Sequence, residues 1–207
     1  MADQARKVRE FWFGRLPLPP ARLEERMRLW FGAGLSAESR REYDAALRER
    51  FEPLVREAAQ GRLDSWADSP RRRLSLILLL DQLPRNLYRG TPRAYAADER
   101  ALALALSGIQ SGADAALDVA ERIFFYMPLE HAESREAQDE SVAAYRRLLA
   151  ETAEPLKPTL AAVLRNAESH RSIIERFGRF PHRNRILGRN TTPEEQRYLE
   201  GRAGAAE

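Results

Sequence analysis

The chain has 207 residues, 43% of them hydrophobic and 31% charged, and this balance excludes an intrinsically disordered protein. Its formal charge of +3 comes from 34 basic and 31 acidic residues, which is too even to imply nucleic acid as a partner. The absence of cysteine excludes a disulfide framework, a thiolate nucleophile and Cys-ligated metal sites, and favours a cytoplasmic setting.

Apolar residues recur with a period of 3.6 along most of the chain, whereas no stretch alternates with a period of two for long enough to predict a strand. We expect the first two helices on either side of Pro20, the second ending at Gly32 and Gly34. Ser36 is a good N-cap for a third, long helix that stops at Gly61. The amino terminus lacks the apolar core of a signal peptide, and we expect neither export nor a membrane partner.

Ser69-Pro70 and Thr91-Pro92 each combine an N-cap with a proline at the first helical position, and predict helices over 71–83 and 93–109. Later helices are predicted over Ala113–Met127, Arg135–Glu151 and Pro155–Phe177, and a capping box at 192–195 opens a short last helix. About nine helices with short connections predict one all-α domain over 1–200, with a frayed tail over 201–207. Such helices pack as antiparallel pairs, either in a bundle or in a stacked array.

The helix over 71–83 is apolar on every side between Leu74 and Leu80, apart from one serine, and therefore should run through the core. Asp81 follows directly, so its carboxylate needs a cationic or hydrogen-bonding partner, for which Arg85 is the nearest candidate. Pro84 disfavours helical backbone at Leu83 and frees a carbonyl group, which Arg85 or Asn86 can satisfy. We call the polar residues around Pro84 the first polar corner. The favoured interpretation is that they stabilise the fold, and the alternative is that they belong to a ligand site.

A second polar corner follows the helix that ends at Gly178. The segment RFPHRNRILGR over 179–189 contains four arginines and one histidine but no acid. These residues include the candidate ligand-binding side chains Arg179, Arg183 and Asn184, and the forked guanidinium group suits a carboxylate or phosphate. The counter-charge is either an external anion or the acidic segment over 130–140, which begins with Glu130.

The three histidines are His131, His170 and His182. His170 shares a helical face with apolar residues, so we expect a satisfied core histidine. His131 and His182 are the candidate acid or base residues, with Asp81 as an orienting carboxylate. No metal site or cofactor is predicted, because the histidine spacing matches no metal-ligand pattern and no nucleotide-binding motif is present.

The motifs FWFG over 11–14, LDQLPRNLYRG over 80–90, the Ala-Asp step at 97–98, FFYMPLEHAES over 124–134 and FGRFPHRNRILGRNTTPEE over 177–195 together resemble one family. This is the bacterial domain of unknown function 924 family, and the resemblance covers nearly the whole chain in order. It implies a fold similar to tetratricopeptide-repeat proteins, in which stacked helix pairs form a concave surface. It implies no activity.

The leading hypothesis is a binding module that holds an anionic small molecule or an acidic peptide end at a concavity lined by Arg, Asn and His. The alternative is a hydrolase or transferase that uses His131 or His182 as acid or base, with arginines stabilising negative charge. Both predict that the two corners meet, so that one site contains Asp81, Arg85, Asn86, His131, Arg179, His182, Arg183 and Asn184.

Overall fold

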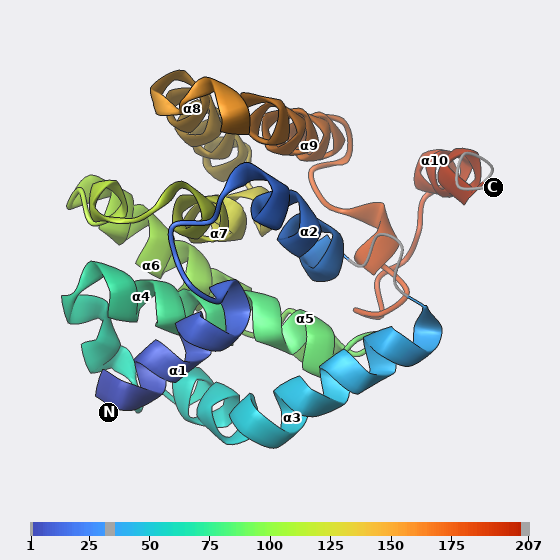
Figure 1. Cartoon of the computed structure of the whole chain (residues 1–207). Helices are drawn as coiled ribbons and strands as arrows, with labels where there is room; N and C mark the ends of the chain where they lie inside the picture. The colour runs from blue at the N-terminus through green and yellow to red at the C-terminus, as the bar shows by residue number, and fades with distance from the viewer. Residues whose placement is uncertain (1, 32–35, 204–207) are drawn as a thin grey trace.

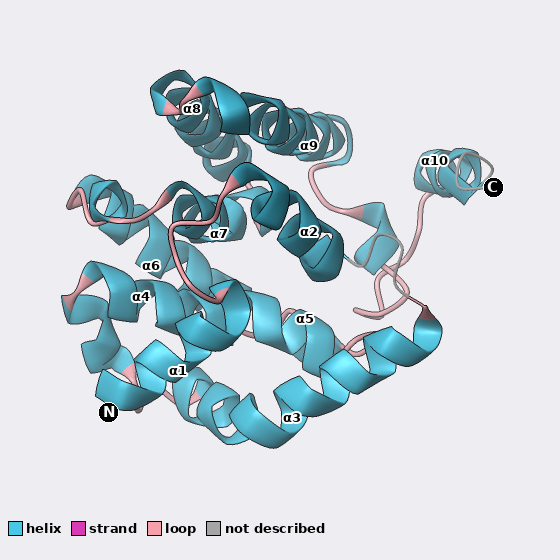
Figure 2. Ribbon diagram, in the orientation of Figure 1, coloured by secondary structure: helices cyan, strands magenta, loops and turns pink. Residues whose placement is uncertain are grey.

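The computed structural model describes residues 2–31 and 36–203, and within these ranges it contains helices and loops but no strand (Figure 2). The predicted all-α class is confirmed. When α4, the π-helical turn η2 and α5 are counted as one continuous helix, the described residues form nine helices. Gly32 and Gly34, the predicted end of the second helix, lie outside the described residues. Among the described residues, no helix is long and apolar enough to cross a membrane.

The α-helical segments follow one another in this order (Figure 1): α1 (Ala2–Phe13), α2 (Pro20–Phe31), α3 (Ala37–Ala59), α4 (Pro70–Ile77), α5 (Leu83–Leu87), α6 (Asp98–Gln110), α7 (Val119–His131), α8 (Arg135–Glu151), α9 (Lys157–Phe177) and α10 (Pro193–Ala203). Short 3-10 turns connect several of them, of which η3 (Pro92–Ala94) and η6 (Pro181–Arg183) matter for the site. Residues 201–203, predicted as part of a frayed tail, belong to α10, and residues 204–207 lie outside the description.

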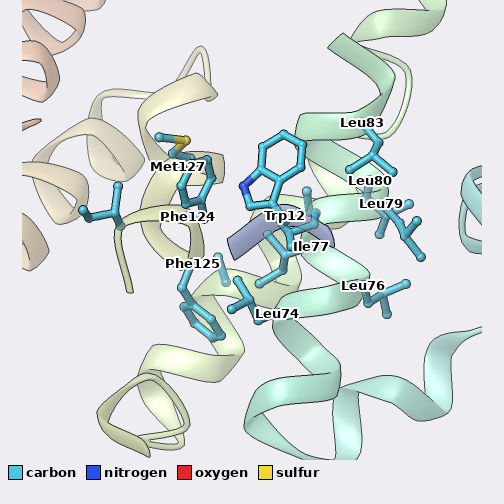
Figure 3. Close-up of a cluster of buried hydrophobic side chains, with 14 of the residues drawn as sticks. Trp12, Leu74, Leu76, Ile77, Leu79, Leu80, Leu83, Phe124, Phe125 and Met127 are labelled. Atoms are coloured by element: carbon cyan, nitrogen blue, oxygen red, sulfur yellow. The ribbon is translucent and has the colours of Figure 1, made fainter. Parts of the chain in front are cut away.

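The core is built around α4 and η2, whose side chains from Leu74 to Leu80 are fully buried, as the sequence predicts. The Trp12 ring of α1 packs between this helix and the Phe124 ring of α7, with 5.5 Å between the two ring centroids (Figure 3). A second, smaller core joins the end of α9 to η6 and α10 through Ile174 and Phe180. This small core fixes the Arg-rich segment to the body of the protein.

Helix pairs α7/α8 and α8/α9 pack against each other, so neighbours in sequence are neighbours in space (Figure 1). This is what short connections between long helices require. The finer expectation of a tetratricopeptide-repeat-like array stays a prediction.

Pro84 does not end its helix, so the expectation for Leu83 is wrong. The backbone of Leu83 is helical, with φ −62° and ψ −41°, and its N–H group bonds to the carbonyl of Leu78. The preceding turn η2 (Leu78–Gln82) is π-helical, and its one extra residue shifts the backbone bonds from i−4 to i−5. The helix thereby continues past the proline and turns Asp81 towards α7.

Two other predicted helix boundaries are wrong, and both belong to helices that contribute residues to the site. The helix predicted over 93–109 begins only at Asp98, because Thr91-Pro92 opens the short 3-10 turn η3 instead, and the Thr91 hydroxyl donates to the carbonyl of Tyr88 rather than capping a helix. The helix predicted over Ala113–Met127 instead begins after Asp118 and continues through Pro128 to His131. Pro128 removes one backbone bond, but its buried neighbours keep the last turn helical.

Candidate functional site

The two polar corners meet at one carboxylate, that of Asp98 at the start of α6. Arg85 of α5 binds it with both terminal nitrogens, at 3.0 and 2.9 Å. Arg183 of η6 approaches the same carboxylate from the other side, with 3.5 Å between Nη1 and Oδ2. Asp98 belongs to a family motif but was not predicted as a site residue, although it connects the two corners that were expected to converge.

Asp81 lies fully buried in η2 and is surrounded by three donors. Arg85 Nη1 lies 3.0 Å from its Oδ1 atom, His131 Nδ1 lies 2.7 Å from the same oxygen, and Gln82 Nε2 lies 2.5 Å from Oδ2. Burial alone raises the pKa of this carboxyl group, but the charge of Arg85 and the bonds from His131 and Gln82 outweigh it and hold the pKa well below its usual range. Arg85 also donates to the backbone carbonyl of Asp81, at 2.7 Å. The Asp81–Arg85 pair predicted from the sequence is therefore present.

His131 occupies the final turn of α7, where Asp81 holds its Nδ1 atom. Burial lowers the pKa of the imidazole, as does the charge of Arg85, and the opposing effect of Asp81 does not restore it. The ring is therefore favoured in its neutral form, with Nδ1–H donated to Asp81. Nε2 makes no hydrogen bond to any described residue, so this nitrogen is the one left for a ligand.

Arg183 is buried, and its charge is only partly compensated. Nη2 donates to the backbone carbonyl of His131 at 3.0 Å, Nη1 has only the 3.5 Å contact with Asp98, and Nε has no partner. The guanidinium lies over the rings of Tyr95 and Phe180, at 4.8 and 4.5 Å from their centroids. Burial lowers the pKa of Arg183, and the nearby charge of Arg85 lowers it further. These are the signs of a cation that lacks a full partner.

A cavity of about 620 Å³ opens beside His131 and Arg183, within the usual size range of small-molecule sites. Its walls come from η3 and the loop before α6, from α6, from the end of α7 with the residues after it, and from η6. Most of the lining surface is apolar, and the polar remainder comes from three carboxylates, one histidine, one serine and one arginine. The lining residues are Pro92, Tyr95, Ala96, Asp98, Glu99, Leu102, His131, Ala132, Glu133, Ser134, Arg183 and Leu187.

Two of the other three arginines in the Arg-rich segment are neutralised within the chain. Arg189 binds Glu133 with two nitrogens, at 2.6 and 3.0 Å, so the acidic segment over 130–140 does supply a counter-charge. Arg179 binds Glu195 of α10 in the same way, at 2.7 and 2.9 Å. Glu195 also closes the predicted capping box, because it accepts from the backbone of Thr192. These ion pairs leave Arg183 as the arginine of this segment that faces the cavity.

Four of the eight residues expected to converge do so: Asp81, Arg85, His131 and Arg183. Four do not. The Asn86 amide donates to Asp44 of α3, and Arg179 and Asn184 bind Glu195. The His182 side chain is exposed and lies outside the cavity lining, with its ring tilted by 42° to that of Phe180.

Glu130, predicted as a ligand-binding residue, points to the opposite side of α7. Its buried carboxylate accepts from Asn166 and from His170, both at 2.5 Å. His170 therefore faces inward and has a partner, as predicted. His131 bonds to Asp81 whereas His170 bonds to Glu130, so the two histidines are held by different carboxylates.

Sequence comparison places the chain among proteins that share its whole length. The model of a family described as bacterial protein of unknown function (DUF924) matches residues 8–203. The solved structure of the protein of unknown function ATU0120 from Agrobacterium tumefaciens is 38% identical, covers 97% of this chain and 98% of that chain, and superimposes with a TM-score of 0.78. No curated protein matches the chain.

Proposed function

The chain belongs to the DUF924 family of bacterial proteins of unknown function, and we propose that it binds a small organic monoanion, a carboxylate with an apolar body. The carboxylate group is bound by Arg183, and the apolar body fills the cavity against Tyr95, Leu102 and Leu187. The proposed setting is the cytoplasm, which suits a chain without cysteine.

The incomplete pairing of Arg183 carries this proposal. A buried cation is stable only when it is paired and hydrogen-bonded, and removing one partner of a buried pair leaves a costly unpaired charge. The nearest acid, Asp98, already uses both oxygens to bind Arg85. The Nε–H group is buried and lacks an acceptor, which an external carboxylate would supply when the guanidinium turns towards the cavity.

The charges around the cavity favour one negative charge over two. Of the carboxylates that line this space, Asp98 and Glu133 are each bound by an arginine outside the lining, whereas Glu99 has no ion pair among the described residues. A phosphate dianion or a nucleic-acid backbone would bring a second negative charge beside Glu99 that Arg183 does not balance. A monocarboxylate brings only the charge that Arg183 can balance. A peptide would enter by its carboxyl terminus rather than by acidic side chains along its length.

Calorimetric titration tests this proposal, with benzoate, propionate and inorganic phosphate as ligands and a short apolar peptide with either a free or an amidated carboxyl terminus. We expect benzoate or the free peptide to bind, and phosphate and the amidated peptide to give no heat. In Arg183→Gln, affinity falls by about tenfold or more, because a hydrogen bond to a charged group contributes about 1.5–3 kcal/mol.

Arg185→Gln is the matched control, since Arg185 is exposed, lies two residues away and does not line the cavity. The control removes the same charge and leaves affinity unchanged. Thermal melts confirm that both variants are folded. Equal binding by wild type and Arg183→Gln, or tight binding of phosphate, contradicts the proposal.

A further inference from the structure

We propose that the cavity is a hydrolytic site, in which His131 acts as general base on a water molecule that cleaves a neutral carboxylic ester. This inference rests on the proposed function, since the acid released is the carboxylate that Arg183 binds. Asp81 is the positioning residue for His131.

The Asp81–His131 pair has the geometry of an oriented base. The distance of 2.7 Å between Asp81 Oδ1 and His131 Nδ1 fixes the ring, and the buried Asp81 is itself held by Arg85 and Gln82. A carboxylate on Nδ1 selects the tautomer in which Nε2 carries the lone pair. Because His131 lines the cavity, that lone pair is available to a water molecule inside it.

Arg183 lies beside this base and suits the charge that develops in the reaction. Its Nη2 atom donates to the backbone carbonyl of His131, so the guanidinium and the imidazole line one part of the cavity. The Nε–H group is buried and has no partner, and a turn of the guanidinium towards the cavity would let it donate to the oxyanion formed during acyl transfer. A neutral ester gains a single negative charge in that step, which is the charge that one cation can balance.

Water is the nucleophile, because the one aliphatic hydroxyl group in the lining is already engaged. Ser134 donates to Glu136 at 2.7 Å and accepts from the N–H group of Ala137, as the N-cap of α8. Its proton therefore has no path to His131 in this arrangement. A serine-bound acyl intermediate is not part of the proposal.

Hydrolysis proceeds by addition of water to the ester and then loss of the alcohol. The water oxygen forms a bond to the ester carbonyl carbon while His131 Nε2 accepts a water proton, and the carbonyl electron pair moves to the oxygen that faces Arg183. The electron pair then reforms the carbonyl, the bond to the alcohol oxygen breaks, and the proton on Nε2 passes to that oxygen. Ester and water become alcohol and carboxylic acid, which ionises and binds to Arg183.

The first experiment measures access to Nε2 without any choice of substrate. Diethyl pyrocarbonate acylates unprotonated imidazole nitrogen, and the three histidines are distinguished by mass spectrometry of peptides. We expect His131 to be modified, and saturating benzoate to slow that modification about tenfold while the exposed His182 is unaffected. An unreactive His131 beside a reactive His182 overturns the inference.

The second experiment measures hydrolysis of p-nitrophenyl benzoate by wild type, His131→Gln and His182→Gln. We expect kcat/KM to fall by a factor of about 100 or more in His131→Gln, the usual range for loss of a general base, and to stay unchanged in His182→Gln. Benzoate affinity in His131→Gln stays near that of wild type. If benzoate binds but wild type and His131→Gln hydrolyse equally, the catalytic inference fails and the binding proposal stands. If benzoate does not bind at all, the proposed function fails first.

The pH profile separates positioning by Asp81 from mere structural support. The groups around His131 are Asp81, Arg85, Asp98, Glu130 and Arg183. Their combined effect with burial lowers the pKa of His131, so hydrolysis should persist below pH 6.5 and fall only as more acidic solution protonates the ring. Asp81→Asn removes a charge that raises this pKa, so the acidic limb moves to still lower pH while kcat falls. An unshifted limb contradicts the positioning role.

Discussion

Arg85 and Arg183 both reach Asp98, but their charges are compensated differently. Arg85 touches two carboxylates, those of Asp81 and Asp98, at distances of 2.9–3.0 Å. Arg183 has one distant carboxylate and a backbone carbonyl. Arg85 is therefore the structural cation of the site, and Arg183 is the cation that can take a ligand.

Replacing Arg85 tests this division. Arg85→Gln leaves Asp81 and Asp98 without their common partner, and breaking a buried ion pair costs about 3–5 kcal/mol. We expect this loss in the free energy of unfolding measured with urea. Arg89→Gln is the control. The Arg89 side chain is about half exposed, and its one ion pair, with Asp44, is long at 3.5 Å. Such a pair contributes less than about 1 kcal/mol to the free energy of unfolding. Similar losses in the two variants would show that Arg85 is not the structural cation.

Contacts between residues that are close along the chain can be predicted from the sequence better than contacts between distant residues. Asp81 and Arg85 stand four residues apart on one helix, so their contact follows from helical geometry. Asn86 follows directly, yet its partner is Asp44, 42 residues earlier, and no local rule selects that acid. Asp98 was missed for the same reason, since its role depends on residues 13 and 85 positions away.

Among the elements, the turn η2 decides where the site lies. A regular α-helix over 78–82 would rotate Asp81 away from its present direction, whereas the π-helical turn adds one residue and aims the carboxylate at His131 of α7. Pro84 was a correct signal for an irregularity, but the sequence does not say whether a helix stops or widens at such a residue. The outcome depends on burial, because Leu83 and Pro84 are enclosed by neighbouring helices.

Close packing of α6 on α4 and α7 supplies a second test at this scale. A Cβ atom added to Gly108 of α6 would lie 2.4 Å from Cζ of the buried Phe125 and 2.9 Å from Cδ of Arg73. We expect Gly108→Ala to destabilise the protein by about 1–3 kcal/mol, because the fully buried ring has no space into which to move. Thermal and urea unfolding both report this change.

Gly201→Ala is the matched control for that substitution. Gly201 also lies in a helix, α10, but a Cβ atom there meets open space, so the change should be neutral or stabilise by up to about 1 kcal/mol. A neutral result for Gly108→Ala would mean that α6 does not pack as tightly as the structure shows.

Across the whole molecule, the site exists only because α5, α6, α7 and η6 meet. The all-α class and most helix starts follow from local patterns such as the apolar period and the Ser36 and Thr192 caps. The meeting of the two corners was a physical inference about polar groups that need partners, and it succeeded for four of eight residues. Three of the other four bind Glu195 or Asp44, acids that the inference had not considered as their partners, and His182 lies exposed outside the cavity.

A crystal structure grown with saturating benzoate would show directly whether Arg183 binds a carboxylate inside this cavity. We expect a carboxylate oxygen about 2.7–3.2 Å from Arg183 Nε, with the phenyl ring against Leu102 and Leu187. Benzoate bound elsewhere, or an empty cavity with Arg183 Nε turned onto an acceptor of the protein, would contradict it.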